Sequence, residues 1–253
     1  MKNIITKVSL FIFLFTSTVI YADGVINKPE KILIVLTSHT KLGDTAEKTG
    51  FWLQELTHPY YEFTKAGYSV DVASIGGGIA PLDSKSFEEK DEYHQVFLND
   101  AKLMAKVIQS IPLAEVDSND YQVIMYAGGS GPMWDFADNK DINRISSAIY
   151  ENKGIVSAVC HGNAALINIR LSNGKLLIAD KHIAAFTNEE EVSLGTAEIV
   201  PFLLQDKLIE RGAIHVYGKA WEENVVVENR LVTGQNPASA KKVAQSIITL
   251  LEQ

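Results

Sequence analysis

The chain has 253 residues, of which 46% are hydrophobic and 21% are charged, and its formal net charge is −8 at pH 7. These fractions are typical of a soluble globular protein and exclude a disordered or collagen-like chain. The single cysteine excludes an intramolecular disulfide framework and any zinc or iron–sulfur site that needs several cysteines.

The first 22 residues are typical of a secretory signal peptide. Lys2 and Lys7 give a positive start, residues 8–15 form an apolar run, and the small residue Ala22 marks the expected cleavage point. A membrane anchor is the alternative, but the apolar run is short and hydroxyl residues follow it. Cleavage removes two lysines and no acidic residue, which leaves 31 acidic residues against 21 basic ones and a net charge of −10. We therefore expect a secreted or periplasmic protein that binds neither a membrane nor nucleic acid.

Strands and helices alternate along the rest of the chain. Apolar runs predict buried strands over residues 31–37, 69–74, 121–127 and 154–159. Helices are expected from about residue 49 to Gly67, with a kink or restart at Pro59, and over residues 96–110, 141–152, 199–211 and 238–251. Residues 176–186 predict a short hairpin-like pair, and residues 224–233 predict two strands around a turn at 228–230.

This alternation predicts an α/β fold: a mainly parallel sheet with helices on both faces, in one domain over residues 28–253. In such sheets functional residues gather beyond the carboxyl ends of the strands. Three segments are expected there, namely residues 37–39, 128–131 and 160–162.

Cys160 lies where a buried strand turns sharply into a helix-forming run. This arrangement is that of a nucleophile elbow, and Gly162 gives room for the turn. The start of the following helix would lower the pKa of the thiol and favour the thiolate. The alternative is a buried apolar cysteine, which is the commoner fate of a lone cysteine.

The base and the acid that would serve this cysteine stay open at this point. His161 can face the sulfur only if the turn is sharp, and His182 is the rival base. An acid that orients the imidazole is expected among Glu189, Glu190 and Glu191. Both Asn188 with Glu191 and Thr187 with Glu190 match a helix capping box, so the pattern does not choose among the three.

Two further elements are candidates for the site. Glu55 lies in an apolar stretch of a helix, where burial would favour its protonated form and let it shuttle a proton, although a solvated helix face is the usual place for glutamate. The loop 128–131 offers backbone N–H groups at Gly129 and Ser130 that, with that of His161, would bind an oxyanion or substrate. The six histidines show no metal-ligand spacing, so we expect no metal and no cofactor.

Residues 158–162, with the sequence Ala-Val-Cys-His-Gly, resemble the elbow of the ThiJ/PfpI superfamily, whose members are relatives of class I glutamine amidotransferase domains. Further segments resemble its heat-shock-protein-31-like branch in one order along the chain: residues 37–39, 48–50, 55–59, 128–131, 186–191 and 231–239. The resemblance implies a flavodoxin-like three-layer sandwich and a homodimer. It also implies a triad of Cys160, His161 and Glu191, with Glu55 beside the nucleophile.

The same resemblance implies a glutathione-independent glyoxalase (glyoxalase III, of the D-lactate dehydratase type) that converts methylglyoxal, a small reactive aldehyde, to lactate in stress protection. The alternatives are a cysteine amidase or peptidase of the same fold and a stress chaperone or deglycase. Ser130 and Asn163 depart from the pattern, since many relatives carry histidine and proline there. The expected export signal is a third departure.

Overall fold

The computed structural model describes residues 31–88 and 91–253. The predicted signal peptide and its cleavage site lie outside these residues. The boundary of the predicted domain at residue 28 also lies outside them, and the single domain stays a prediction.

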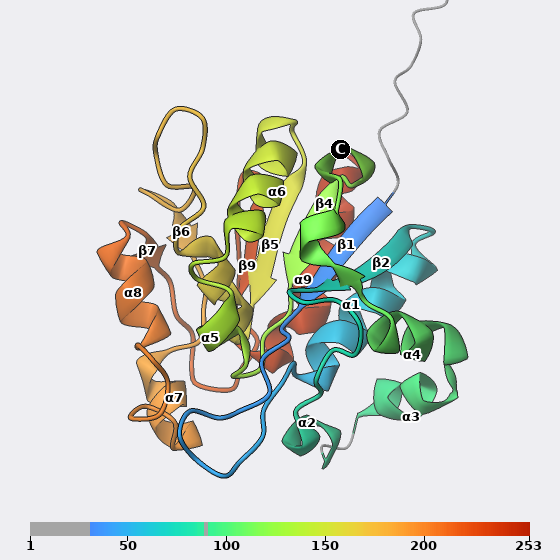
Figure 1. Cartoon of the computed structure of the whole chain (residues 1–253). Helices are drawn as coiled ribbons and strands as arrows, with labels where there is room; N and C mark the ends of the chain where they lie inside the picture. Colours follow the sequence, from blue (N-terminus) through green and yellow to red (C-terminus); the bar gives the residue numbers. More distant parts are fainter. Residues whose placement is uncertain (1–30, 89–90) are drawn as a thin grey trace, which may run out of the picture.

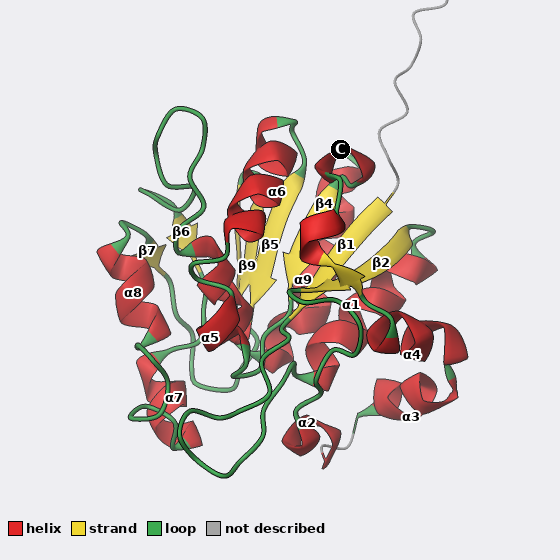
Figure 2. Ribbon diagram, viewed as in Figure 1, coloured by secondary structure: helices red, strands yellow, loops and turns green. Residues whose placement is uncertain are grey.

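A seven-stranded sheet forms the centre of the described chain. Figures 1 and 2 show the sheet with helices packed around it. Its strand order is β3-β2-β1-β4-β5-β9-β8, and every neighbouring pair is parallel except β8 with β9. The strands are β1 (Lys31–Leu36), β2 (Ser69–Ser74), β3 (Ile111–Pro112), β4 (Val123–Tyr126), β5 (Ile155–Val159), β8 (Val225–Glu228) and β9 (Leu231–Gly234). Because β1, β4 and β5 are buried along nearly their whole length, they show the continuous apolar pattern of strands that are covered on both faces.

Helices cover both faces of this sheet, so the expected α/β sandwich is confirmed. Helices α1 (Leu53–Lys65) and α9 (Ala240–Leu251) pack on each other against one face, and α6 (Lys140–Glu151) covers β4 and β5 on the other. The remaining helices are α2 (Ser84–Glu88), α3 (Glu92–Asn99), α4 (Ala101–Ile108), α5 (Pro132–Asp135), α7 (Asn188–Leu194) and α8 (Leu204–Glu210). Short 3₁₀ turns are η1 (Leu113–Glu115), η2 (Ser118–Asp120), η3 (Cys160–Leu166) and η4 (Pro237–Ser239).

Two predicted helices differ from the observed ones. The helix expected over residues 96–110 is two helices, because the Asp100 carboxylate accepts hydrogen bonds from the backbone N–H groups of Lys102 and Leu103 and starts α4 anew. The helix expected over residues 199–211 begins only at Leu204, because the residue that precedes Pro201 is disfavoured in a helix. Helix α1, by contrast, continues through Pro59 without a restart.

The hairpin-like pair expected over residues 176–186 is wrong. Instead β6 (His182–Ile183) pairs in parallel with β7 (Ile214–His215) in a separate two-stranded sheet. The two strands around a turn at residues 228–230 are confirmed as β8 and β9, and Asn229 takes the left-handed conformation that the turn needs. Along the described chain, no helix has the length and apolar character needed to span a bilayer.

The carboxyl ends of β1, β4, β5 and β9 meet at one edge of the sheet, because these strands are parallel. The direction in which the strand order proceeds reverses between β1 and β4, which in open α/β sheets leaves a crevice for ligands. The loop 128–131 follows β4 and Cys160 follows β5, so the segments that the sequence singles out lie at this edge.

Candidate active site

The backbone at Cys160 makes a sharp elbow. Its φ angle is 56°, a left-handed value that is uncommon for a residue other than glycine and that occurs where surrounding contacts hold a strained site. A Cβ atom at Gly162 would lie 2.3 Å from the Tyr126 carbonyl oxygen, so only glycine lets the chain turn so close to β4. The Asn163 side-chain amide donates to the carbonyl oxygens of Cys160 (3.0 Å) and Gly234 (3.1 Å), which ties the elbow to β9.

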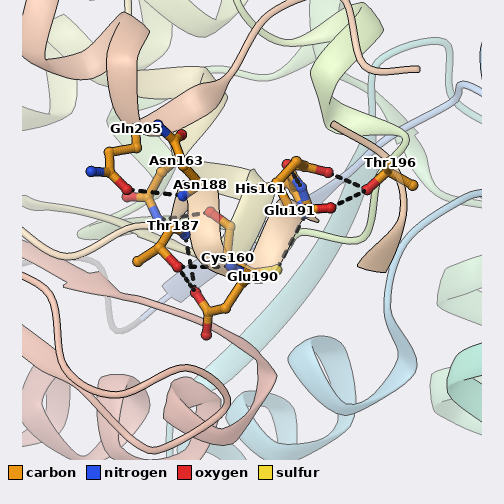
Figure 3. Close-up of polar contacts among 9 residues, drawn as sticks. All are labelled: Cys160, His161, Asn163, Thr187, Asn188, Glu190, Glu191, Thr196 and Gln205. Atoms are coloured by element: carbon orange, nitrogen blue, oxygen red, sulfur yellow. Dashed lines mark hydrogen bonds and ion pairs between the residues drawn. The ribbon is translucent and has the colours of Figure 1, made fainter. Parts of the chain in front are cut away.

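A buried relay of three side chains starts at the sulfur. Cys160 Sγ lies 3.4 Å from His161 Nδ1, and His161 Nε2 lies 2.8 Å from Glu191 Oε2. The Thr196 hydroxyl donates a hydrogen bond to the other carboxylate oxygen of Glu191. Figure 3 shows Glu191 between His161 and Thr196. All four side chains are buried, so the relay is shielded from water.

The way α7 begins decides which of the three acids faces His161. Thr187 is the N-cap and forms the capping box with Glu190, and the Glu190 carboxylate accepts from the Thr187 N–H (3.0 Å) and hydroxyl (2.9 Å). The alternative box of Asn188 with Glu191 does not form, which leaves Glu191 one position along the helix and directed toward His161 (Figure 3). Glu189 is exposed.

His182, the rival base, lies away from this relay. It is an exposed residue of β6, and its Nδ1 lies 3.0 Å from a carboxylate oxygen of Glu228 on β8. The sharp turn at Cys160 instead brings the adjacent His161 ring to the sulfur, so His161 is the imidazole that can exchange a proton with the thiol.

Glu55 approaches the nucleophile from α1. Its side chain is fully buried, and Oε2 accepts a hydrogen bond of 2.7 Å from the Gly128 backbone N–H. A Cβ atom at residue 128 would lie 2.9 Å from both Glu55 Oε2 and Cys160 Cβ. Glycine at 128 therefore lets the carboxyl group and the nucleophile share one small space.

Backbone N–H groups of Gly129 and His161 point at the Cys160 sulfur and lower the pKa of its thiol. These are the groups that the sequence offers for an oxyanion hole. Together with Ser130 and Cys160 they line a small pocket with a cavity volume of about 30 Å³. The rest of its wall is Trp52, Phe186, Leu194, Trp221 and Pro237.

Sequence reasoning missed this largely apolar wall. Phe186 and Pro237 lie within segments that the family resemblance singled out, and Trp52 lies between two of them, but none was assigned to a pocket. Leu194 and Trp221 come from segments without a motif. Trp221 packs edge-on against Phe186, with ring centroids 5.5 Å apart, and Phe186 lies against His161 at 4.1 Å. No local periodicity signals such a contact, because it joins residues far apart in the chain.

The expected lowering of the Cys160 thiol pKa is wrong. Burial raises this pKa well above its ordinary value, and the nearby Glu55 carboxylate raises it further. The N–H groups of His161 and Gly129 act in the opposite direction but do not compensate. The helix whose dipole was expected to help is only the 3₁₀ turn η3, which is a weaker source of aligned N–H groups than an α-helix.

Alkylation of Cys160 by iodoacetamide is therefore expected to accelerate with pH and not to level off by pH 9, the ordinary value for a thiol. Glu55→Gln removes a negative charge near the sulfur and should shift the pH profile of alkylation to lower pH. The shift should be partial, because burial is the larger cause of the raised pKa. The matched control is Glu62→Gln on the same helix, where the carboxylate contacts Gln245 and Lys241. If the pH profile of alkylation in Glu55→Gln matched that of the wild type, Glu55 would not act on the Cys160 sulfur.

The pKa of Glu191 moves in the opposite direction. Burial alone would raise it, but the charge and hydrogen bond of His161 and the hydroxyl of Thr196 lower it below its usual value. Glu191 is thus ionised at neutral pH and can only accept from His161 Nε2. In the neutral form of His161 the proton therefore lies on Nε2, and the Nδ1 atom presents a lone pair to the thiol. Among the described residues, no group of three or more His, Cys, Asp or Glu side chains could hold a metal ion.

Comparisons with known proteins find relatives over most of the chain. The model of the DJ-1/PfpI family matches residues 46–250. The chain is 32% identical to Glyoxalase 3 of Candida albicans over 88% of this chain and 98% of that protein. It is also 32% identical to the glutathione-independent glyoxalase HSP31 of Saccharomyces cerevisiae, over 88% and 99%. The solved structure of Rapid Encystment Protein 24 kDa of Francisella tularensis is 41% identical, covers 87% of this chain and 98% of its own, and superposes with a TM-score of 0.85.

These relatives contradict the expected secreted or periplasmic location. The Saccharomyces and Candida proteins that match are glyoxalases of the cytosolic HSP31 type, and nothing in the comparisons supports a signal peptide. The prediction of an exported protein is therefore wrong. The prediction depended on the charge and apolar pattern of residues 1–22 alone, which lie outside the residues that the structure describes.

Proposed function

Because this chain belongs to the DJ-1/PfpI family, we propose that it is a glutathione-independent glyoxalase that converts methylglyoxal to lactate. The observation that carries the proposal is the buried Glu55 carboxyl group beside the relay of Cys160, His161 and Glu191. A relay alone serves acyl transfer, whereas a second proton carrier suits the movement of a proton between two carbons.

The chemistry starts with the addition of Cys160 Sγ to the aldehyde carbon of methylglyoxal. The thiol proton passes to His161 Nδ1, and the new oxyanion is bound by the N–H groups of Gly129 and His161 and then protonated to a hemithioacetal. Because the high pKa of the thiol keeps it protonated at rest, proton transfer to His161 has to accompany the attack.

The hemithioacetal then rearranges by proton transfer. Its first carbon loses a proton to a base, for which Glu55 and His161 are the candidates, the carbonyl oxygen of the second carbon takes up a proton, and an enediol forms. Return of the proton to the second carbon, with loss of the proton from the hydroxyl group on the first carbon, gives a thioester of lactate on Cys160. Water hydrolyses the thioester, which releases lactate and restores the thiol, so no external oxidant or reductant is consumed.

The pocket favours this reaction over the amidase alternative. With a cavity volume of about 30 Å³ and a wall of aromatic and aliphatic side chains, it accommodates a molecule of a few heavy atoms but not a peptide segment. A small aldehyde meets this limit.

Incubation of the purified protein with methylglyoxal in the absence of glutathione is expected to yield lactate, detected with stereospecific lactate dehydrogenases. The same preparation should release no ammonia from glutamine or from peptide amides, because the pocket is too small for them. Release of ammonia without formation of lactate would reject the glyoxalase activity in favour of the amidase activity. Suppression of protein aggregation without lactate would favour the chaperone. The implied homodimer stays a prediction, which light scattering tests.

A further inference from the structure

Glu190 has more hydrogen bonds than a helix cap requires. Its side chain is fully buried. Oε2 accepts both bonds from Thr187, which complete the capping box. Oε1 accepts three further bonds: from the Trp221 backbone N–H (2.8 Å), the Gln235 amide (3.1 Å) and the Asn236 amide (2.8 Å). A buried carboxylate with five donors is a tightly held group, and three of the donors have no part in capping α7.

Those three donors belong to the segments that close the pocket. Residues 216–224, here called the Trp221 loop, join β7 to β8. Gln235 Oε1 accepts from the Gly218 N–H (2.8 Å), and the Asn236 amide donates to the Glu222 carbonyl oxygen (2.8 Å). Glu190 is thus the point where α7, the Trp221 loop and the segment after β9 are joined.

The Trp221 loop needs these hydrogen bonds because the backbone of Trp221 is strained. Its φ angle is 65°, a left-handed value that a bulky residue rarely adopts unless its surroundings hold it. Its indole N–H donates to the Ser193 hydroxyl of α7 (3.3 Å). Its ring packs edge-on against Phe186, which lies against the His161 ring. The position of this indole therefore sets one wall of the pocket beside the base.

We propose that Glu190 is a positioning residue that holds Trp221 in the pocket wall, so that it governs how tightly the substrate binds. Adjacent acids at the start of α7 thus have different tasks: Glu191 orients His161, and Glu190 fixes the wall against which the substrate packs. The kinetic part of this proposal rests on the proposed glyoxalase activity.

Glu190→Gln tests the proposal because an amide cannot replace this carboxylate. Both oxygens of Glu190 face donors only, so the –NH₂ group of glutamine would confront either Thr187 or the donors around Trp221. We expect the KM for methylglyoxal to rise roughly 10-fold, with kcat changed by less than about 3-fold. Trp221→Ala should raise KM similarly, and the double variant should add little, because both changes remove one wall.

Two control variants distinguish the positioning of Trp221 by Glu190 from its part in capping α7 and from a general effect of negative charge. Thr187→Ala removes the capping hydroxyl but leaves the three contacts of Oε1, so it should lower the melting temperature without raising KM. Glu189→Gln removes a neighbouring exposed carboxylate and should change neither. A second measurement needs no turnover: the rate of Cys160 alkylation by the bulky N-ethylmaleimide relative to the smaller iodoacetamide should rise several-fold in Glu190→Gln and in Trp221→Ala.

The outcomes are distinct. Absence of lactate with wild-type protein would reject the glyoxalase, whereas the alkylation ratio would still decide the role of Glu190. An unchanged KM and ratio in Glu190→Gln would overturn the proposal, as would a lower kcat at unchanged KM or a Thr187→Ala variant with the same rise in KM. If Glu190→Gln does not fold, Glu190→Asp replaces it. Its carboxylate is too short to bridge Thr187 and Trp221, so a wild-type KM and ratio in that variant would equally overturn the proposal.

Discussion

Replacement of Cys160 by alanine is expected to lower the rate of lactate formation from methylglyoxal by roughly 10³-fold or more, because the covalent bond to the substrate can no longer form. The sulfur is the atom on which the His161 imidazole and the backbone N–H groups of Gly129 and His161 converge. Without it, these groups surround an empty position and leave only a slow background reaction. A lactate assay that runs for hours, at an enzyme concentration far above that used for the wild type, sets an upper limit on the residual rate of the variant.

Folding of this variant is the first control. The alanine has to adopt the same left-handed backbone as Cys160, so the far-ultraviolet circular dichroism spectrum and the melting temperature should be compared with those of the wild type. Cys160→Ser keeps a polar atom at the position and serves as the isosteric comparison. Turnover by either variant within a few-fold of the wild type would reject Cys160 as the nucleophile and the glyoxalase mechanism with it.

Glu191→Gln is expected to lower kcat/KM by roughly 10²- to 10⁴-fold, because it reverses the tautomer of His161. The ionised carboxylate accepts from Nε2 and leaves Nδ1 as an acceptor toward the sulfur. A glutamine amide that donates to Nε2 places the imidazole proton on Nδ1, so His161 can no longer take the thiol proton. Steady-state kinetics with methylglyoxal measure the loss.

Thr196→Val is the graded comparison for this variant. It removes the hydrogen bonds of the Thr196 hydroxyl to the carboxylate and to the backbone carbonyl oxygen of Glu191, but it leaves the carboxylate and its contact with His161. The loss of kcat/KM should therefore be much smaller, on the order of 10-fold or less. A Glu191→Gln variant that is no slower than Thr196→Val would show that the imidazole is oriented by another group. It would remove Glu191 from the relay and leave Cys160 in place.

Much of the fold could be predicted from the sequence because buried strands and elbows have local patterns. The apolar runs over residues 31–37 and 154–159 correspond to β1 and β5, and the strand, sharp turn and glycine around Cys160 correspond to the observed elbow. The errors concern elements whose bounds depend on single side chains or on remote partners. Asp100 divides a helix by capping it, and β6 pairs with β7 instead of with a neighbour in the chain.

By itself, the sequence determined the mainly parallel sheet, the edge at which the site lies and the single sulfur at its centre, because each follows from residues that are neighbours along the chain. The residue pattern alone left the imidazole and the acid open, and only the resemblance to the family named His161 and Glu191. The tertiary structure shows why these two lie beside the sulfur: the capping box at Thr187 takes Glu190 and leaves Glu191 free to reach His161, 30 positions away. It also decided the direction of the thiol pKa. Loss of water around Cys160 and the approach of Glu55 outweigh the local N–H groups, and both effects arise only when distant segments pack together.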